Sequence, residues 1–278
     1  MWLDHLPVAK PYAFLFVALL ATLSPTPSWA QGSAPAQSQW SVGMKVWFNE
    51  WDTWATNSAS IQLAGETSRF EVVEAFGFPS EVSAVPFVSY RYKDFFGSLS
   101  AMAKTKYATP DAIRGGVETA SRSEVDFNVG YLVLPGLALT AGIKQLTQTL
   151  NSDEFRWRGP VLGVSSSAPV APGWAIYGTG GVGRMRAEFG VGNSDANGKD
   201  SFNADYRLGE FGLAYSAPWA KRFLKSLLIT VGYRSQYVAT KSYALTVFDS
   251  LGDPTNAYTS SQLKDTTQGL AIGITGSF

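Results

Sequence analysis

Two carboxylates, Glu124 and Asp126, have the spacing in this sequence that most directly suggests chemistry. Side chains two positions apart lie on the same face of a β-strand, and paired carboxylates can act as general acid and base. Lys104 and Lys106 have the same spacing in the preceding segment. Opposite charges on adjacent antiparallel strands stabilise each other. We therefore interpret Glu124 and Asp126 as cross-strand ion-pair partners of the two lysines and not as an active site.

The side chains that most often serve as nucleophiles, bases and metal ligands are scarce. The sequence has one histidine, His5, and no cysteine, which leaves little for transition-metal or thiolate chemistry. The glycine run at 178–183 lacks the lysine of a phosphate-binding loop. Asp249, Asp253 and Asn256 do not have the spacing of a calcium-binding EF-hand. We predict no metal site, no cofactor and no enzymatic activity.

The composition suits a chain with both an apolar and a polar surface to satisfy. Of its 278 residues, 45% are hydrophobic, 14% are aromatic and 16% are charged, against about 25% charged residues in an ordinary soluble domain. The formal net charge is zero, so nothing in the charge balance points to nucleic acid as a partner.

The N-terminus has the features of a secretory signal peptide. Lys10 precedes the apolar run at 14–23, and Ser28-Trp29-Ala30 provides a small-x-small cleavage site. The run is shorter than the roughly 20 apolar residues of a spanning helix. We predict a signal peptide at 1–30, cleaved after Ala30, and a flexible leader at 31–39; an uncleaved membrane anchor is the alternative.

From Trp40 onward, apolar residues alternate with small or polar ones in ten segments. Val125, Phe127 and Val129 belong to one such segment. Most segments have nine residues or more, which fits tilted membrane strands of about 9–11 residues better than soluble strands of about 5–6. A change of phase near Gly209 predicts a β-bulge there.

The connectors between these segments alternate in length. Short connectors lie at 93–94, 135–136, 169–173 and 217–222, and long ones lie at 50–81, 108–120, 150–156, 190–201 and 239–265. Short turns at one end, long loops at the other and aromatic residues near the strand ends are typical of membrane barrels. We predict an all-β chain that forms a closed antiparallel up-and-down transmembrane β-barrel over residues 40–278. Ten strands are expected, with eight or twelve as alternatives, and a soluble secreted all-β protein is the rival interpretation.

The last ten residues resemble the C-terminal sorting signal of Gram-negative outer-membrane barrels. The aromatic Phe278 ends the chain, and the apolar residues Leu270, Ile272 and Ile274 alternate before it. The resemblance implies location in the bacterial outer membrane, with its lipid and lipopolysaccharide as partners, and recognition by the barrel-insertion machinery. Several barrel enzymes of this class (phospholipases, omptin proteases and lipid A deacylases) use a catalytic histidine, which the predicted mature chain lacks.

The polar face of the predicted strands would line the lumen. The candidate lumen-lining residues are Lys45, Arg91, Lys104, Lys106, Glu124, Asp126, Lys144, Arg184, Arg186, Glu188 and Arg234, joined by Asp205, Arg207 and Glu210. Basic residues outnumber acidic ones in this set, so a water-filled lumen would favour anions. We expect either a narrow channel for small, anionic solutes or a barrel filled by salt-bridged side chains, because small barrels have interiors that side chains nearly fill. The filled barrel would be structural or would act through its long loops; the oligomeric state stays open.

Overall fold

The structure is a computed structural model. It describes residues 38–63, 66–108, 119–151, 153–189, 193–194, 200–248 and 254–278. The predicted signal peptide, most of the predicted leader, Asp249 and Asp253 lie outside these residues. Among the described residues, no helix is long and apolar enough to cross a membrane.

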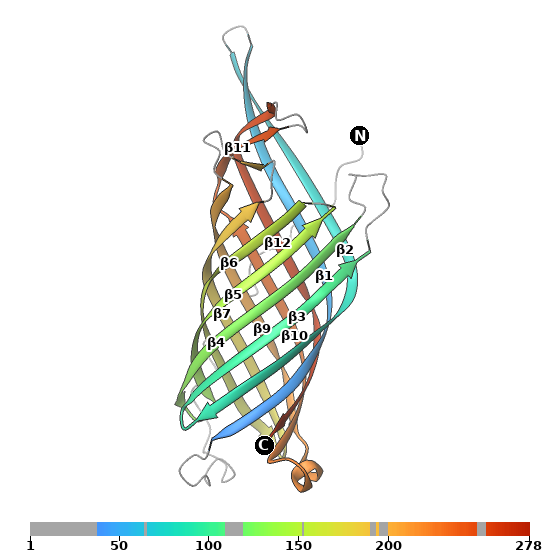
Figure 1. Ribbon diagram of the computed structural model, residues 1–278, viewed down its shortest axis with the longest axis vertical. Helices are drawn as coiled ribbons and strands as arrows, with labels where there is room; N and C mark the ends of the chain where they lie inside the picture. Colours follow the sequence, from blue (N-terminus) through green and yellow to red (C-terminus); the bar gives the residue numbers. More distant parts are fainter. Residues whose placement is uncertain are drawn as a thin grey trace. The chain divides into compact units, whose positions relative to one another are not determined.

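Ten long strands form one closed antiparallel sheet, because β1 pairs with both β2 and β12 (Figure 1). They are β1 (Gln39–Leu63), β2 (Glu66–Tyr92), β3 (Phe95–Tyr107), β4 (Ala120–Leu134), β5 (Leu137–Leu150), β6 (Asp153–Ala171), β7 (Trp174–Phe189), β9 (Ser201–Ser216), β10 (Ser226–Thr240) and β12 (Pro254–Ser277). The short strands β8 (Asn193–Ser194) and β11 (Tyr243–Phe248) pair next to the upper part of β12. The predicted fold class and the strand number of ten are confirmed.

At one end of the barrel, where β1 begins and β12 ends, every connection between neighbouring strands is short: 93–94, 135–136, 172–173 and 217–225 (Figure 1). Gly136 and Gly173, in two of these turns, have φ values of 83° and 79°, a left-handed conformation that glycine adopts without steric cost. The β9–β10 connection contains the short 3-10 helix η4 (Pro218–Arg222). Short turns face the periplasm in outer-membrane barrels, so we assign this end to the periplasmic side.

Three of the predicted long loops are mostly strand. Residues 50–81 belong largely to β1 and β2, whose pairing continues to Leu63 and Glu66, and 239–265 contributes to β10, β11 and β12. The prediction for 150–156 is also wrong, because β5 and β6 are joined at residues 151–152. The barrel therefore extends beyond the apolar band, the belt of exposed apolar side chains on its outer face. The β1–β2 hairpin rises furthest (Figure 1). The alternation weakens in this part of the chain because its outer face no longer contacts lipid.

The predicted bulge near Gly209 is wrong for the same reason. β9 pairs with both β7 and β10 through Gly209 without a register shift. Phe211 and Leu213 share the outer face of β9 with Asp205 and Arg207. The outer face of β9 changes from apolar to charged where it leaves the membrane. In the sequence, this change has the same appearance as a shift in the apolar–polar alternation.

Two prolines lie inside strands where pairing on one side stops. Pro86 pairs with β1, but the β2–β3 ladder ends at Phe87 and Ser100. Pro160 pairs with β5, and the β6–β7 ladder omits it. Proline has no backbone N–H to donate. At each position the chain therefore remains in the strand but pairs with only one of its two neighbouring strands.

Substitution of Val231 by arginine tests the position of the apolar band. Val231 lies on the outer face of β10 between Leu213 and Ile272 of the flanking strands. We expect Val231→Arg to lower the free energy of unfolding by about 2–4 kcal/mol, the cost of arginine at the bilayer midplane, measured by denaturant titration in lipid vesicles. Asn203→Arg, on the outer face above the band, should change it little; equal losses in the two variants would contradict this assignment.

Candidate functional site

Side chains fill much of the interior of the barrel. Each of the ten long strands contributes at least one inward side chain that is almost fully buried. Examples, in strand order, are Trp51, Phe78, Tyr107, Arg122, Leu146, Trp157, Met185, Tyr206, Gln236 and Asp265. Because these residues include charged groups, the way in which they are paired determines what the lumen can do.

Asp265 is the centre of a buried polar cluster. It is 1% exposed and accepts hydrogen bonds from Arg122 Nη1 and Gln148 Nε2, each at 2.7 Å, and from the indole N–H of Trp51. A second buried indole, that of Trp157, donates to Gln148 Oε1 at 3.0 Å. A buried carboxylate is costly unless it is paired and hydrogen-bonded, and this one is satisfied by three donors.

Glu124 extends this cluster across β4 and β5. Lys144 Nζ donates to Glu124 at 2.6 Å and to Asp126 at 2.9–3.0 Å. Arg122 Nε also lies 3.1 Å from Glu124 Oε1, and Gln236 Nε2 donates to its other oxygen at 3.1 Å. The two carboxylates that could have formed an acid–base pair are thus held by cations.

Two of these hydrogen bonds span the barrel. In the closed strand order, β4 and β10 lie five positions apart in either direction, and so do β5 and β12. The Gln236–Glu124 bond joins the first pair of strands, and the Gln148–Asp265 bond joins the second. Side chains from opposite walls therefore meet in the lumen and narrow it at this level.

A fourth carboxylate, Glu210, binds cations from two other strands. Lys45 Nζ lies 2.7 Å from its carboxylate oxygens and Arg234 Nη1 lies 3.2 Å from one of them. Tyr177 donates its hydroxyl to Glu210 at 3.0 Å. We call the eight charged side chains of these clusters the ion network; it comprises Lys45, Arg122, Lys144, Arg234, Glu124, Asp126, Glu210 and Asp265. With four basic and four acidic members, it has none of the predicted basic excess.

Aromatic clusters fill the space beside the ion network. Trp51 stacks on Phe78 at 4.6 Å between ring centroids, and Tyr107 meets both rings edge-on. Across the barrel, Trp157 and Phe189 belong to a larger apolar cluster built from β5, β6, β7, β9 and β10. These clusters fill a further part of the lumen with apolar side chains.

A cavity of about 400 Å³ lies inside the barrel. Small and hydroxyl-bearing residues such as Ser98, Ser165 and Thr275 line it, and the ion network contributes Lys45 and Glu210. The three small residues lie in the strand portions near the short turns. The cavity therefore occupies the periplasmic part of the lumen and reaches up to the ion network, where Glu124, Lys144 and Arg234 also line it.

Lys104 and Lys106 do not line the lumen as predicted. A bulge in β3 places Met102 opposite Glu124 and Thr105 opposite Arg122. The extra residue reverses the alternation, so both lysines are exposed on the outside while Thr105 and Tyr107 turn inward. The predicted cross-strand pairing with Glu124 and Asp126 is therefore wrong: Lys144 on β5 pairs with both carboxylates, and Arg122 pairs with Glu124 from the same strand.

Arg184, Arg186 and Glu188 also differ from the prediction. On β7 the alternate residues Met185 and Phe189 are buried inside the barrel, and the three charged side chains are exposed outside. Period two separates the two faces of a strand but does not say which one points inward once the strand has left the lipid.

Other predicted lumen residues occupy different places. Asp205 and Arg207 are exposed on the outer face of β9. Arg91 is exposed beside a short turn, where its Nε donates to the carbonyl of Lys93 at 2.8 Å. The structure places Lys45, Lys144 and Arg234, with Glu124, Asp126 and Glu210, inside the lumen.

The sequence does not predict several of the buried residues that fill the lumen. The sequence pattern places Trp51 and Asp265 in loops, and Arg122 and Gln148 lie beyond the strand ends that it predicts. A signal was present for Asp265, because it continues the alternate-position row of small and polar residues that runs through Thr267 and Thr275.

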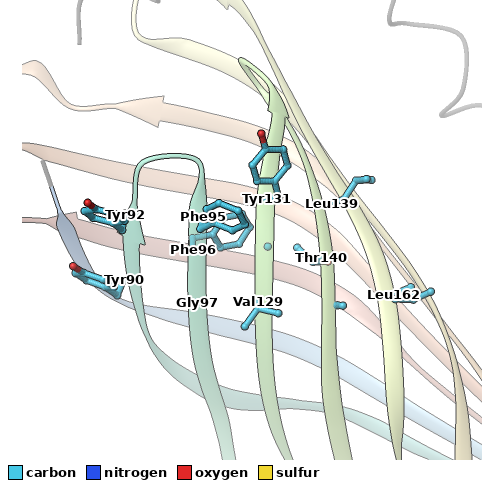
Figure 2. Close-up of a pocket in the computed structure, with 12 residues that line it drawn as sticks. Tyr90, Tyr92, Phe95, Phe96, Gly97, Val129, Tyr131, Leu139, Thr140 and Leu162 are labelled. Carbon is cyan, nitrogen blue, oxygen red and sulfur yellow. The ribbon is translucent and has the colours of Figure 1, made fainter. Parts of the chain in front are cut away.

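An apolar hollow of about 630 Å³ marks the outer surface near the short turns. Figure 2 shows Tyr90, Tyr92, Phe95 and Tyr131 around it, and the rings of Phe95 and Tyr131 lie 4.9 Å apart. These aromatic residues form the predicted belt at the periplasmic side, where amphipathic rings settle at the membrane interface. The hollow opens on the outer face, and Phe96 and Thr140 line both this hollow and the cavity inside the lumen.

Comparison with known proteins shows the fold. The chain matches no protein-family model and no curated protein. It is similar to the outer-membrane protease OmpT from Escherichia coli, with a TM-score of 0.54 and 10% identity over 90% of this chain and 100% of that one. It also resembles a Pseudomonas aeruginosa FadL homologue (TM-score 0.31, 8% identity, 86% of this chain and 90% of that one) and the outer membrane protein AlkL (0.35, 10%, 91% and 96%). With its closed barrel and outer apolar band, the chain has the architecture of a bacterial outer-membrane protein.

Removal of the central carboxylate tests the energetics of the lumen. Asp265→Ala leaves the buried guanidinium of Arg122 without this partner, and we expect a loss of about 3–5 kcal/mol in unfolding free energy. Asp205→Ala, which removes an exposed carboxylate from the outer face of β9, is the matched control and should cost little. Denaturant unfolding in lipid vesicles measures both, and a loss below about 1 kcal/mol at Asp265 would mean that the cluster is solvated.

Proposed function

We propose that this protein is a non-conducting outer-membrane barrel that acts through its extended extracellular end. The observation that carries the proposal is the pair of hydrogen bonds that join opposite walls, Gln236–Glu124 and Gln148–Asp265. Their four side chains are at most 5% exposed. Water-filled conduction would require these groups to separate, and breaking a buried charge pair is strongly unfavourable.

The β1–β2 hairpin supports a role outside the membrane. It rises beyond the other strands (Figure 1). Near its end, Phe70 and Val72 are exposed on one face of β2, and Val73 is exposed on the other face. Exposed apolar side chains that gather on a surface are typical of interaction sites. This hairpin is therefore the part of the chain that we assign to contact with an extracellular partner.

A narrow channel for small solutes is the second candidate function. It is favoured by the polar cavity of about 400 Å³ in the periplasmic part of the lumen. Such a channel would have to open by rearranging the ion network. The equal numbers of basic and acidic side chains in that network give no reason for anion selectivity.

An enzymatic role has less support. The structural similarity to a protease extends to the fold, at 10% identity. Within the described part of the chain there is no histidine, and the buried carboxylates are held in ion pairs. We therefore propose that the lumen has a structural role and carries no catalytic centre.

Planar-bilayer recording separates the two leading candidates. We expect the purified wild-type protein to show no unitary current steps, even at high voltage, while its heat-modifiable gel mobility shows an intact barrel. The variant Arg122→Ser with Asp265→Ser keeps the charge balance and replaces two large side chains that fill the lumen by small ones. Current steps should therefore appear.

The control is Arg158→Ser with Asp205→Ser, which removes one charge of each sign from the outer face and should stay silent. Reproducible unitary steps from the folded wild-type protein would overturn the proposal in favour of the channel.

A further inference from the structure

Arginines follow the apolar band on three neighbouring strands of the outer face. Along β6, β7 and β9, the last large lipid-facing residues are Leu162, Val182 and Phe211, all more than 60% exposed. Above them on the same face, the first charged residues are Arg158, Arg184 and Arg207, with Arg186 one step further on β7. We call these four residues the arginine cluster. It lies at the level where lipid tails give way to headgroups.

The strand register brings these arginines together. Arg158 lies directly opposite Arg186 in the β6–β7 ladder, and Arg207 lies opposite Val182 on β7. Like charges directly opposite each other destabilise a sheet. An anion bound between them would remove this cost.

Few carboxylates are placed to neutralise the arginine cluster. Asp205 lies opposite Arg184 in the ladder. Among the described residues, no carboxylate oxygen lies within the 4.0 Å of a salt bridge from any of the four guanidinium groups. Arg186 donates to the hydroxyl of Ser201 at 2.6 Å. The cluster thus keeps donors available on the outer surface.

Other strands have different residues at the same boundary. On β1 the first polar residue above Phe48 is Glu50, and on β12 Gln268 follows Leu270. On β10 it is Ser235 that follows Tyr233. If the arginines only served to place charge in water at the interface, they would have no reason to gather on one side of the barrel.

We propose that the arginine cluster binds the phosphate groups of a lipid in the outer leaflet. The planar guanidinium group matches phosphate with two parallel hydrogen bonds. The surface directly below is apolar and faces outward, so acyl chains of the same molecule can pack there. This second contact favours a phosphorylated lipid over free phosphate. The proposal does not rest on whether the barrel conducts.

The test measures binding of diphosphoryl lipid A to the full-length protein in detergent by native mass spectrometry. The variant Arg158→Gln with Arg207→Gln removes two charges that have no carboxylate opposite them. We expect its dissociation constant to rise about tenfold or more, since charge-assisted hydrogen bonds are among the strong ones. The matched control, Lys104→Gln with Lys106→Gln, removes two exposed charges from β3 and should bind as the wild type does.

Two further ligands distinguish the contribution of the phosphate groups from that of the acyl chains to lipid affinity. Lipid A without its phosphates should bind at least tenfold more weakly than the diphosphoryl form, and millimolar inorganic phosphate should not displace it. Equal weakening in the two variants would show general charge attraction and overturn the site. Unchanged binding of dephosphorylated lipid A, or displacement by inorganic phosphate, would overturn recognition of a phosphorylated lipid. Heat-modifiable mobility verifies that every variant is folded.

Discussion

Closure of the backbone ladder between β1 and β12 is the constraint on which the rest of the structure depends. A bilayer offers no water to unpaired N–H and C=O groups, so a sheet can span it only when every strand has two neighbours. The chain meets this condition by pairing Ser41 with Ser277 and continuing without interruption to Ser58 and Ser260. Once the ring is closed, each strand has one face toward lipid or water outside and one toward a narrow interior.

The interior then has to be filled or hydrated. In this barrel much of it is filled, by aromatic clusters together with an ion network of equal positive and negative charge. Arg122 and Asp265 are buried far from solvent, where each would be costly alone. Their partners come from strands across the barrel. The same contacts that satisfy the charges therefore hold opposite walls together, which connects the energetics of the lumen to its closure.

The outer face follows a different rule, because its surroundings change along each strand. Leu213 and Val231 lie in the lipid band, while Asp205 and Arg207 lie on the same side of the sheet in water. The strands continue through this boundary without a break in pairing. A chemically sharp border consequently forms around the barrel, and on β6, β7 and β9 its first charged residues are arginines.

The sequence by itself determined the class of fold. Alternation of the kind seen around Val129 specifies strands with one lipid-facing side, because lipid excludes polar side chains from that face. Turn residues such as Gly136 specified the tight connections, since a left-handed conformation favours glycine. Only the tertiary structure decided which face pointed inward at Lys104 and Arg184. Above the lipid both faces can carry polar residues, and one bulge reverses the order. The pairing of Arg122 with Asp265, 143 residues away, likewise depends on how the ring closes, and no local pattern encodes it.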